Sequence, residues 1–324
     1  MKIKALAFGV AAALSLSACG GSTGEPTTGS ESGAASYSIG IATIQSHPAL
    51  DAVTEGFKAA FEEAGVEVTF DEQNAQGDQT TLTNIANTFA SSDHDGFLAI
   101  ATPTAQALAN VITDRPIVFA AVTDPVSAGL VGSWDAPDAN ITGVSDLNPM
   151  ADQLKLIQEA TPEVKSIGIV YASGEVNSEV QVQEATDAAA TLGLEIRTAT
   201  VTNSSEVQQA AESLDVDAFL IPTDNTVVSA AESVIQVAEQ KQAPVFASDE
   251  STVERGAAAG LSVNYTQQGR DAAAVMLQLL EGTPASDIPV ATQKEFDLFV
   301  NEAAATKQGL TLPDAIVERA TTKY

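Results

Sequence analysis

The stretch Ser38-Ile39-Gly40-Ile41-Ala42-Thr43-Ile44 sets the architecture, because it recurs later as Ser166-Ile167-Gly168-Ile169-Val170-Tyr171. Both runs are short, apolar and rich in β-branched residues, as buried strands are. Gly65-Val66-Glu67-Val68 and Gly193-Leu194-Glu195-Ile196 keep the same offset of 128 residues. Two further pairs continue the series, namely Asp95-Gly96-Phe97-Leu98 with Asp217-Ala218-Phe219-Leu220 and Pro116-Ile117-Val118-Phe119 with Pro244-Val245-Phe246-Ala247. This ordered series predicts two similar halves, from about 37 to 145 and from about 150 to 262.

Longer Ala-rich amphipathic stretches alternate with these short runs. In residues 51–64, for example, Val53, Phe57 and Phe61 share one helical face, and Gly65 follows as a stop. Strands that alternate with helices predict parallel sheets, so the expected fold class is α/β with two doubly wound, Rossmann-like domains. Strands are expected at 38–44, 66–70, 96–100, 117–120, 166–171, 194–200, 218–221, 245–247 and 258–263.

Composition agrees with two domains and excludes one class of partner. A chain of 324 residues with 44% hydrophobic content can bury a large core. Its 43 acidic and 14 basic side chains leave a net charge of -29. Such a surface repels nucleic acid, so no nucleic-acid partner is expected. The acidity is either a solubility adaptation or an acidic binding surface, and the first interpretation is favoured.

The N-terminus has the features of an export signal. Lys2 and Lys4 precede an apolar run from 5 to 16, and Leu16-Ser17-Ala18 stands directly before Cys19. The run is too short for a permanent membrane span, so residues 1–18 predict a lipoprotein signal peptide. Cys19, the only cysteine, is expected to be acylated and to anchor the chain in the cell membrane, outside the cytoplasm. The alternative is a plain signal peptide with Cys19 incidental.

Residues 19–36 are rich in Gly, Ser and Thr and almost without apolar side chains. Such a composition cannot offset the entropy of ordering, so a flexible tether is expected. With Cys19 lipidated, no intramolecular disulfide can form.

Polar loops follow the predicted strands. Ligands of open parallel sheets bind beyond the carboxyl ends of the strands, near helix N-termini with free N–H groups. The alternative for each single residue is an ordinary N-cap or turn former, whereas convergence on one cleft favours a site. The candidate ligand-binding residues are Gln45, His47, Asn74, Gln76, Thr102, Thr123, Asp124, Glu175, Asn177, Ser178, Thr223, Asp224, Asn225 and Asp249.

Aromatic residues and histidines add little to the site. Phe97, Phe119, Phe219 and Phe246 lie inside strand runs and are expected in the core, whereas Tyr171, Trp134 and Tyr265 lie nearer the predicted cleft or hinge. His47 is expected at the cleft mouth, bonded to ligand or to the opposing domain, or as a helix cap. His94 lies in an Asp-rich turn and is expected in solvent. Two isolated histidines make a metal site unexpected, and no cofactor is expected.

Together the loop motifs resemble one family. They are Gln45 with His47-Pro48-Ala49-Leu50-Asp51, Asn74-Ala75-Gln76-Gly77-Asp78, Ala101-Thr102-Pro103, Ala121-Val122-Thr123-Asp124-Pro125, Asn140-Ile141-Thr142-Gly143, Glu175 with Asn177-Ser178, and Pro222-Thr223-Asp224-Asn225. From about residue 38 to the C-terminus the chain is similar to ABC-transporter substrate-binding lipoproteins, whose best-known members bind tryptophan and other aromatic amino acids.

The resemblance implies a type I periplasmic-binding-protein fold, with two lobes that close like a hinged clamp. The first lobe would comprise 37–145 plus 266–287, and the second 150–262 plus 292–324. Three crossings between the lobes are expected, near 143–149, 261–265 and 288–292.

The implied function is delivery of an aromatic amino acid to an ABC permease with an ATPase subunit. The ligand's carboxylate would be received by hydroxyl and N–H groups at Thr102, Thr123 and Ser178, and its ammonium by Asp224 or Asp249, while Asn177 and Asn225 can serve either end.

Three other functions are weighed against aromatic amino-acid import. A type I clamp can also bind another amino acid, a nucleoside, a sugar or a peptide-like solute, or serve as a sensory binding protein. An enzyme is not expected, because the chain from Tyr37 onward has no Gly-x-Ser-x-Gly elbow, Walker loop or His-Glu-x-x-His pair.

Overall fold

The computed structural model describes residues 36–137 and 139–324. The predicted signal peptide, Cys19 and all of the predicted tether except its last residue lie outside the described residues. Ser36, that last residue, instead begins the first strand, because it pairs with Glu67 in the neighbouring strand.

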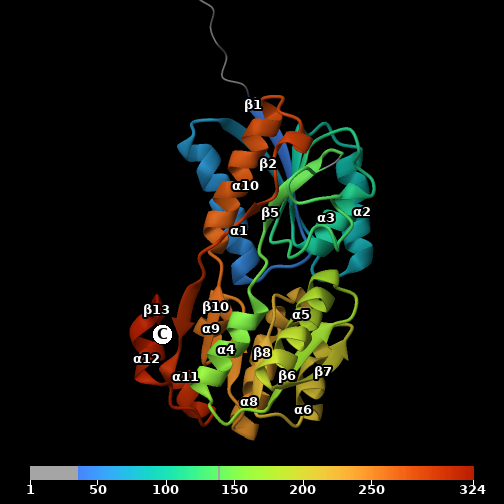
Figure 1. Ribbon diagram of the computed structural model, residues 1–324. Coiled ribbons are helices and arrows are strands. Elements are labelled where there is room, and N and C mark those ends of the chain that lie inside the picture. The colour runs from blue at the N-terminus through green and yellow to red at the C-terminus, as the bar shows by residue number, and fades with distance from the viewer. Residues whose placement is uncertain (1–35, 138) are drawn as a thin grey trace, which may run out of the picture. The chain divides into compact units, whose positions relative to one another are not determined.

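Two sheets organise the described chain (Figure 1). The six-stranded sheet has the order β11-β5-β4-β3-β1-β2, and the seven-stranded sheet has the order β13-β12-β10-β9-β8-β6-β7. The strands of the first sheet are β1 (Ser36–Thr43), β2 (Glu67–Asn74), β3 (Gly96–Ile100), β4 (Ile117–Ala120), β5 (Ile141–Ser145) and β11 (Ala291–Thr292). Those of the second are β6 (Ser166–Ala172), β7 (Glu195–Val201), β8 (Ala218–Ile221), β9 (Val245–Ala247), β10 (Ala259–Ser262), β12 (Asp297–Val300) and β13 (Thr322–Lys323).

The two sheets share one topology, since β2-β1-β3-β4-β5 in the first corresponds to β7-β6-β8-β9-β10 in the second. Neighbouring strands are parallel, except that β12 runs antiparallel to β10. This is the doubly wound order in which loops converge beside the first strand, where the strand order reverses. The predicted α/β class with two doubly wound units is therefore confirmed.

Helices cover both faces of each sheet. In the first half, meaning the six-stranded sheet with its helices, α1 (Pro48–Glu63) lies along α10 (Tyr265–Leu280), and α2 (Gln79–Ala90) lies against α3 (Thr102–Ala109) (Figure 1). The second half contains α4 (Met150–Ala160), α5 (Val176–Leu192), α6 (Val207–Ser213), α7 (Asn225–Ser229), α8 (Ala231–Lys241), α9 (Glu250–Arg255), α11 (Glu302–Lys307) and α12 (Asp314–Arg319). Short 3-10 turns occur at Ser204–Glu206 and Ala285–Asp287.

Alternation along the strands separates the core of the second half into two layers. In β8, Ala218 and Leu220 pack with α4 and α5, whereas Phe219 and Ile221 pack with α6, α7 and α8. Successive side chains of a strand point to opposite faces, so a sheet covered on both sides is apolar on both. Phe97, Phe119, Phe219 and Phe246 are all buried, as predicted.

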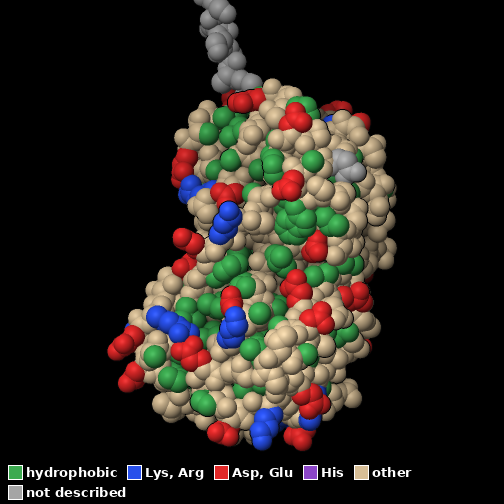
Figure 2. Space-filling view, viewed as in Figure 1, with side chains coloured by type: hydrophobic (Ala, Val, Ile, Leu, Met, Phe, Trp, Pro, Cys, Tyr) green, Lys and Arg blue, Asp and Glu red, His purple; other side chains and the backbone are tan. Residues whose placement is uncertain are grey.

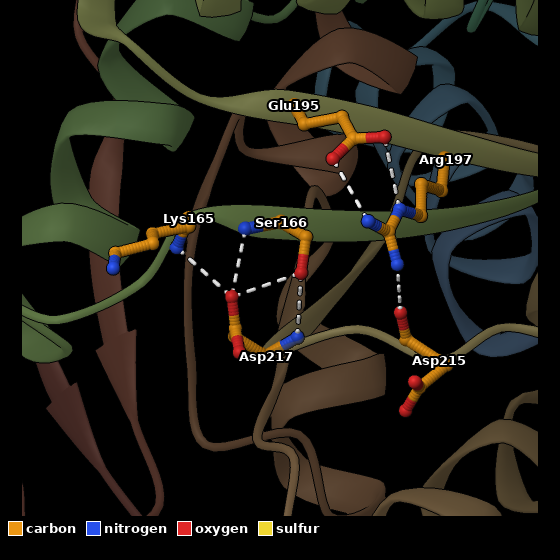
Figure 3. Close-up of polar contacts among 6 residues, drawn as sticks. All are labelled: Lys165, Ser166, Glu195, Arg197, Asp215 and Asp217. Atoms are coloured by element: carbon orange, nitrogen blue, oxygen red, sulfur yellow. Dashed lines mark hydrogen bonds and ion pairs between the residues drawn. The ribbon is translucent and has the colours of Figure 1, made fainter.

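The internal repeat is also visible as a repeated contact at the amino ends of the strands. Asp217 Oδ2 accepts hydrogen bonds from the backbone N–H of Lys165 at 2.9 Å and of Ser166 at 2.8 Å (Figure 3). In the first half, Asp95 Oδ2 accepts from the N–H of Ser38 at 2.8 Å. The Asp before β3 and the Asp before β8 therefore make equivalent contacts, each to the amino-terminal part of the first strand of its half.

Some elements differ from those predicted. Strand β5 was expected only as part of a crossing, because Thr142, Gly143 and Ser145 interrupt its apolar pattern; Gly143 is needed there, since a Cβ would lie 2.1 Å from the carbonyl oxygen of Phe119. Strand β2 extends four residues beyond the predicted end at Phe70, and these polar residues lie at the sheet edge. Helix α1 starts earlier than predicted because Pro48 is tolerated at the first helical position.

The distribution of strands supports the expected lobe boundaries, which stay a proposal. The chain passes from the first sheet to the second between β5 and α4, and returns between β10 and α10. Strand β11 still pairs with β5, so the first sheet extends to Thr292, at the far end of the third expected crossing.

Candidate functional site

A cavity lies at the carboxyl ends of the strands and is lined by both halves. Its lining consists of His47, Ala49, Leu50, Ala121, Asp146, Asn177, Thr223, Asp224, Asn225, Val228, Asp249 and Tyr265. The space between these atoms is about 310 Å³, including solvent at the mouth, but the centre of a water-sized sphere can reach only about 10 Å³ of it. A ligand of amino-acid size therefore requires the lining to move apart.

Two buried aspartates begin helices at this cavity. Asp224 caps α7 by accepting from Val227 N–H at 2.7 Å, and Asp249 caps α9 by accepting from Thr252 N–H at 2.9 Å. The sequence places each carboxylate directly after a buried strand, β8 or β9, where the first turn of a helix offers unpaired N–H groups. The same local rule thus brings both carboxylates to one place.

Asp224 already accepts three hydrogen bonds from the protein. Besides its cap bond, its Oδ2 accepts from Ala172 N–H at 2.6 Å and from the Ser178 hydroxyl at 2.7 Å. Burial, and next the nearby Glu175 carboxylate, raise the pKa of Asp224 to about 7. Its oxygens are committed to the second half, which leaves little acceptor capacity for a ligand.

Asp249 differs, because one of its oxygens is unused. Its Oδ1 accepts from Thr252 N–H and from the Ser251 hydroxyl, whereas its buried Oδ2 has no hydrogen-bond partner. His47 Nδ1 and Asn177 Oδ1 are also buried without a partner. Buried polar atoms are nearly always paired, so three unpaired ones around one cavity indicate that a ligand completes them.

His47 lies where it was expected, at the cavity, but not as a capping side chain. It is the residue before α1, and its side chain makes no cap hydrogen bond. Burial lowers the pKa of His47, against the opposing influence of Asp249 and Asp51. At neutral pH the imidazole is therefore uncharged, and it adds no positive charge to the cavity.

Asp146 is a site residue that the sequence analysis missed. It follows β5, its Oδ1 accepts from the Thr123 hydroxyl at 3.0 Å, and its Oδ2 accepts from the Tyr265 hydroxyl at 3.0 Å. Burial raises its pKa to about 6. The available signal was its place after a strand, and it went unused because β5 itself was not recognised.

Glu175 holds the side-chain amides of Asn177 and Asn225 in place through hydrogen bonds. Its Oε2 accepts from Asn177 Nδ2 at 3.1 Å and from both the backbone N–H and Nδ2 of Asn225, while its Oε1 accepts from Thr226. Asn177 Nδ2 also donates to Thr223 O at 2.9 Å. With its donor group engaged, Asn177 presents its oxygen as the free atom.

Two of the expected carboxylate receptors, Thr123 and Ser178, lie outside the cavity lining and already donate to protein carboxylates. A hydroxyl has one proton, and those of Thr123 and Ser178 go to Asp146 and Asp224. Thr102 has an unpartnered buried hydroxyl but lies outside the cavity lining. The carboxylate role of these three residues stays a prediction, and the observed bonds favour another donor.

Four further candidates lie outside the cavity lining. Gln45 spans the two halves by donating from Nε2 to the carbonyl oxygen of Asn225. Asn74 and Gln76 are exposed and bonded to each other in a turn, and the Asp124 carboxylate caps the turn at Val126 and Ser127. The structure therefore brings together His47, Asn177, Thr223, Asp224, Asn225 and Asp249, with Glu175 and Ser178 behind them.

The remaining ring residues are divided between cavity and core. Tyr265 lines the cavity, whereas Trp134 packs on the first core and Tyr171 on the second. The expectation that His94 is exposed is wrong: its side chain is 13% exposed, because it packs against Phe89 and bonds to Ser38.

Figure 2 shows acidic side chains scattered over the visible face rather than gathered in one patch.

The described residues contain neither a group of side chains suited to a metal ion nor a helix suited to cross a membrane. In the described ranges, no three His, Cys, Asp or Glu side chains are grouped to hold a metal ion. The helices of the same ranges are all too short or too polar to cross a membrane.

The paired doubly wound sheets, with a polar cavity where their loops converge, define a periplasmic-binding-protein fold, the fold of extracytoplasmic solute-binding proteins. Residues 38–324 match the family described as ABC transporter substrate binding protein, so the chain belongs to that family, whose members bind solutes rather than act as enzymes.

Three relatives illustrate the similarity. A protein named tyrosine-binding protein, from Clostridioides difficile, is 38% identical over 82% of this chain and 78% of its own length. An ABC domain from Streptococcus pneumonia in complex with L-Trp is 32% identical, covers 90% of this chain and 100% of its own, and superposes with a TM-score of 0.87. A ligand-free, open substrate-binding protein with adhesive properties, from Clostridium difficile, is 38% identical over 88% and 98% of the two chains, with a TM-score of 0.67.

Proposed function

We propose that this chain is the lipid-anchored solute-binding subunit of an ABC importer, and that it binds an aromatic amino acid in the cavity between its halves. The observation that carries the proposal is the set of three unpartnered buried atoms, on His47, Asn177 and Asp249, around that cavity. Because both halves contribute to them, a ligand that pairs with these atoms links the halves.

The cavity wall suits an amino acid with a large side chain. Leu50, Val228 and the ring of Tyr265 supply apolar surface beside the polar atoms. Small-molecule sites combine such apolar walls with a few placed polar groups. Two relatives support the aromatic assignment, since one is named tyrosine-binding and the other holds L-Trp.

Asp249 is the proposed partner of the ligand's ammonium group. Of the two expected aspartates, Asp224 is occupied by three protein donors, whereas Asp249 keeps a buried free oxygen. A charge-assisted bond to that oxygen is among the stronger hydrogen bonds available to a ligand.

The conformation supports a clamp mechanism. The chain superposes better on the L-Trp complex than on the open, ligand-free relative, although the latter is closer in sequence. The difference is therefore one of arrangement, and we propose that the present structure is the closed state. Ligand would enter an open state and stabilise a closed state with this arrangement of the halves, in which the lining side chains have shifted to make room for it.

Membrane attachment and delivery belong to the same proposal. Acylation of Cys19 would hold the protein outside the cytoplasm, and residues 19–36 would let the clamp reach an ABC permease with its ATPase subunit. The short signal-like segment ending at Ala18 supports this arrangement.

A thermal-shift screen of the purified protein tests the ligand class. Amino acids, sugars and nucleosides would each be added, and ligand at about a hundredfold above its Kd stabilises by roughly 2.7 kcal/mol. Tyrosine, tryptophan or phenylalanine should raise the Tm by several degrees. A rise with sugars or nucleosides alone would reject the aromatic assignment.

A further inference from the structure

The cavity lining differs between the two halves in the carboxylate oxygens that remain free. The first half contributes His47, Ala49, Leu50, Ala121 and Tyr265, and the two oxygens of Asp146, which follows β5, already accept from the Thr123 and Tyr265 hydroxyls. The second half contributes Asp224 and Asp249 together with two asparagines. Among the described residues that line the cavity, none is Lys or Arg. An anionic ligand group therefore has to find its donors among neutral groups.

The first turn of α1 supplies such donors. This helix of 16 residues begins at Pro48, which has no N–H, and the side chain of His47 makes no cap bond. The N–H groups of Ala49 and Leu50 therefore have neither a helical partner nor a capping side chain, and both residues line the cavity. The positive end of the helix dipole adds a favourable field for an anion.

The second half presents acceptors instead. Asp249 Oδ2 and Asn177 Oδ1 are buried and unpartnered. The orientation of the Asn177 amide is set by Glu175 and Thr223 O, which take its donor group. This side of the cavity therefore suits a group that carries several N–H donors and a positive charge.

We infer that each half recognises one charge of a zwitterion: the first turn of α1 binds the ligand's carboxylate, and Asp249 with Asn177 binds its ammonium. This inference rests on the proposed solute-binding function and deepens it. A ligand with both charges bridges the halves and holds them closed, whereas a ligand with one charge engages only one half. The unpartnered His47 Nδ1, buried beside α1, is a further polar contact on the carboxylate side.

Pro48 allows a test of the carboxylate side. It is exposed at the start of α1 and does not line the cavity. In P48E a negative charge occupies the same helix end, which favours the helix but repels the ligand's carboxylate. Calorimetric titration with L-tryptophan should show about fivefold weaker binding than for the neutral P48Q, with no loss of Tm. With L-tryptophanamide, which lacks the carboxylate charge, this difference should disappear.

Asp249 allows the matching test of the ammonium side. Asn keeps the cap bond to Thr252, so D249N removes the charge while the start of α9 is retained. Asp78 is a matched control, because it caps α2 in the same way and lies outside the cavity. L-tryptophan should bind D249N at least tenfold more weakly than D78N.

Three results would count against this inference or its basis in different ways. Equal affinity for P48E and P48Q, or for D249N and D78N, overturns the division of charge. If the wild type binds only a non-aromatic amino acid, the aromatic assignment fails, and the same variants titrated with that amino acid decide the division of charge. If it binds only an uncharged solute, both the division of charge and the amino-acid assignment fail.

Discussion

Asp146 connects the loop after β4 to the start of α10 through two hydrogen bonds. It follows β5 and accepts from Thr123 in the first half and from Tyr265 at the start of α10. Its burial raises its pKa from 3.8 to about 6, so the charged form is disfavoured in the folded protein. Between these two values the folded chain keeps a proton that the unfolded chain has lost.

Because the folded protein retains this proton, the contribution of Asp146 to the free energy of unfolding depends on pH. Stability from this group is greatest at low pH and declines as the pH rises through about 6, because a buried charge must then be maintained. In D146N the side chain cannot ionise, so the free-energy cost of a buried charge is absent. The free energy of unfolding of D146N relative to wild type should therefore improve by about 1 kcal/mol between pH 5 and pH 7.5, measured by urea denaturation.

The exposed Asp93 provides the control for loss of one negative charge in an acidic protein. D93N should show a difference from wild type that stays constant over the same pH range. If the difference in free energy of unfolding between D146N and wild type is also constant over this pH range, burial does not raise the pKa of Asp146.

At the scale of elements, α1 and α10 approach each other more closely than side chains allow. A Cβ on Gly56 would lie 2.1 Å from the carbonyl oxygen of Thr266, and one on Gly269 would lie 2.1 Å from that of Val53. These reciprocal glycines let the two backbones pack directly. The contact also places the first turn of α1 beside the crossing that leads into α10.

G56A tests this packing through the sign of its effect. In an ordinary helix interior, replacing Gly by Ala stabilises by up to about 1 kcal/mol. Here the helices must separate, so we expect a loss of roughly 2 kcal/mol in the free energy of unfolding. G174A is the control, since its Cβ meets nothing within 4 Å, and it should change stability by less than about 0.5 kcal/mol. A stabilised G56A would contradict the close approach.

At the scale of the whole molecule, hydrogen bonds between the two halves outside the cavity also stabilise the closed arrangement. Gln45 donates to the Asn225 carbonyl, and the Thr123 and Thr223 hydroxyls lie 3.4 Å apart. Such contacts exist only when the halves are together. They stabilise that state whether or not a ligand is bound.

Q45A should therefore weaken ligand binding, although Gln45 does not line the cavity. Loss of one hydrogen bond of about 1 kcal/mol in the closed state predicts roughly fivefold weaker affinity for the bound amino acid. The Tm of the ligand-free protein should change little, because Gln45 lies outside both cores. Q79A, at an exposed glutamine that shares a surface groove with Gln45, should bind like wild type. Unchanged affinity of Q45A would show that this bond does not contribute to closure.

The sequence by itself determined the strands, their repetition and the loops that form the site. Buried parallel strands need continuous apolar runs, and the helices that follow them need polar N-caps. Both features depend only on a short stretch of neighbouring residues. β3, β4, β8 and β9 have the predicted bounds, and Asp224 and Asp249 lie at the cavity for this reason. Only the tertiary structure decided which polar atoms remain free. Asp224 and Asp249 look alike in sequence, but Ala172 and Ser178 occupy the first and leave an oxygen of the second unpaired. That difference arises from contacts between distant segments, which no local pattern records.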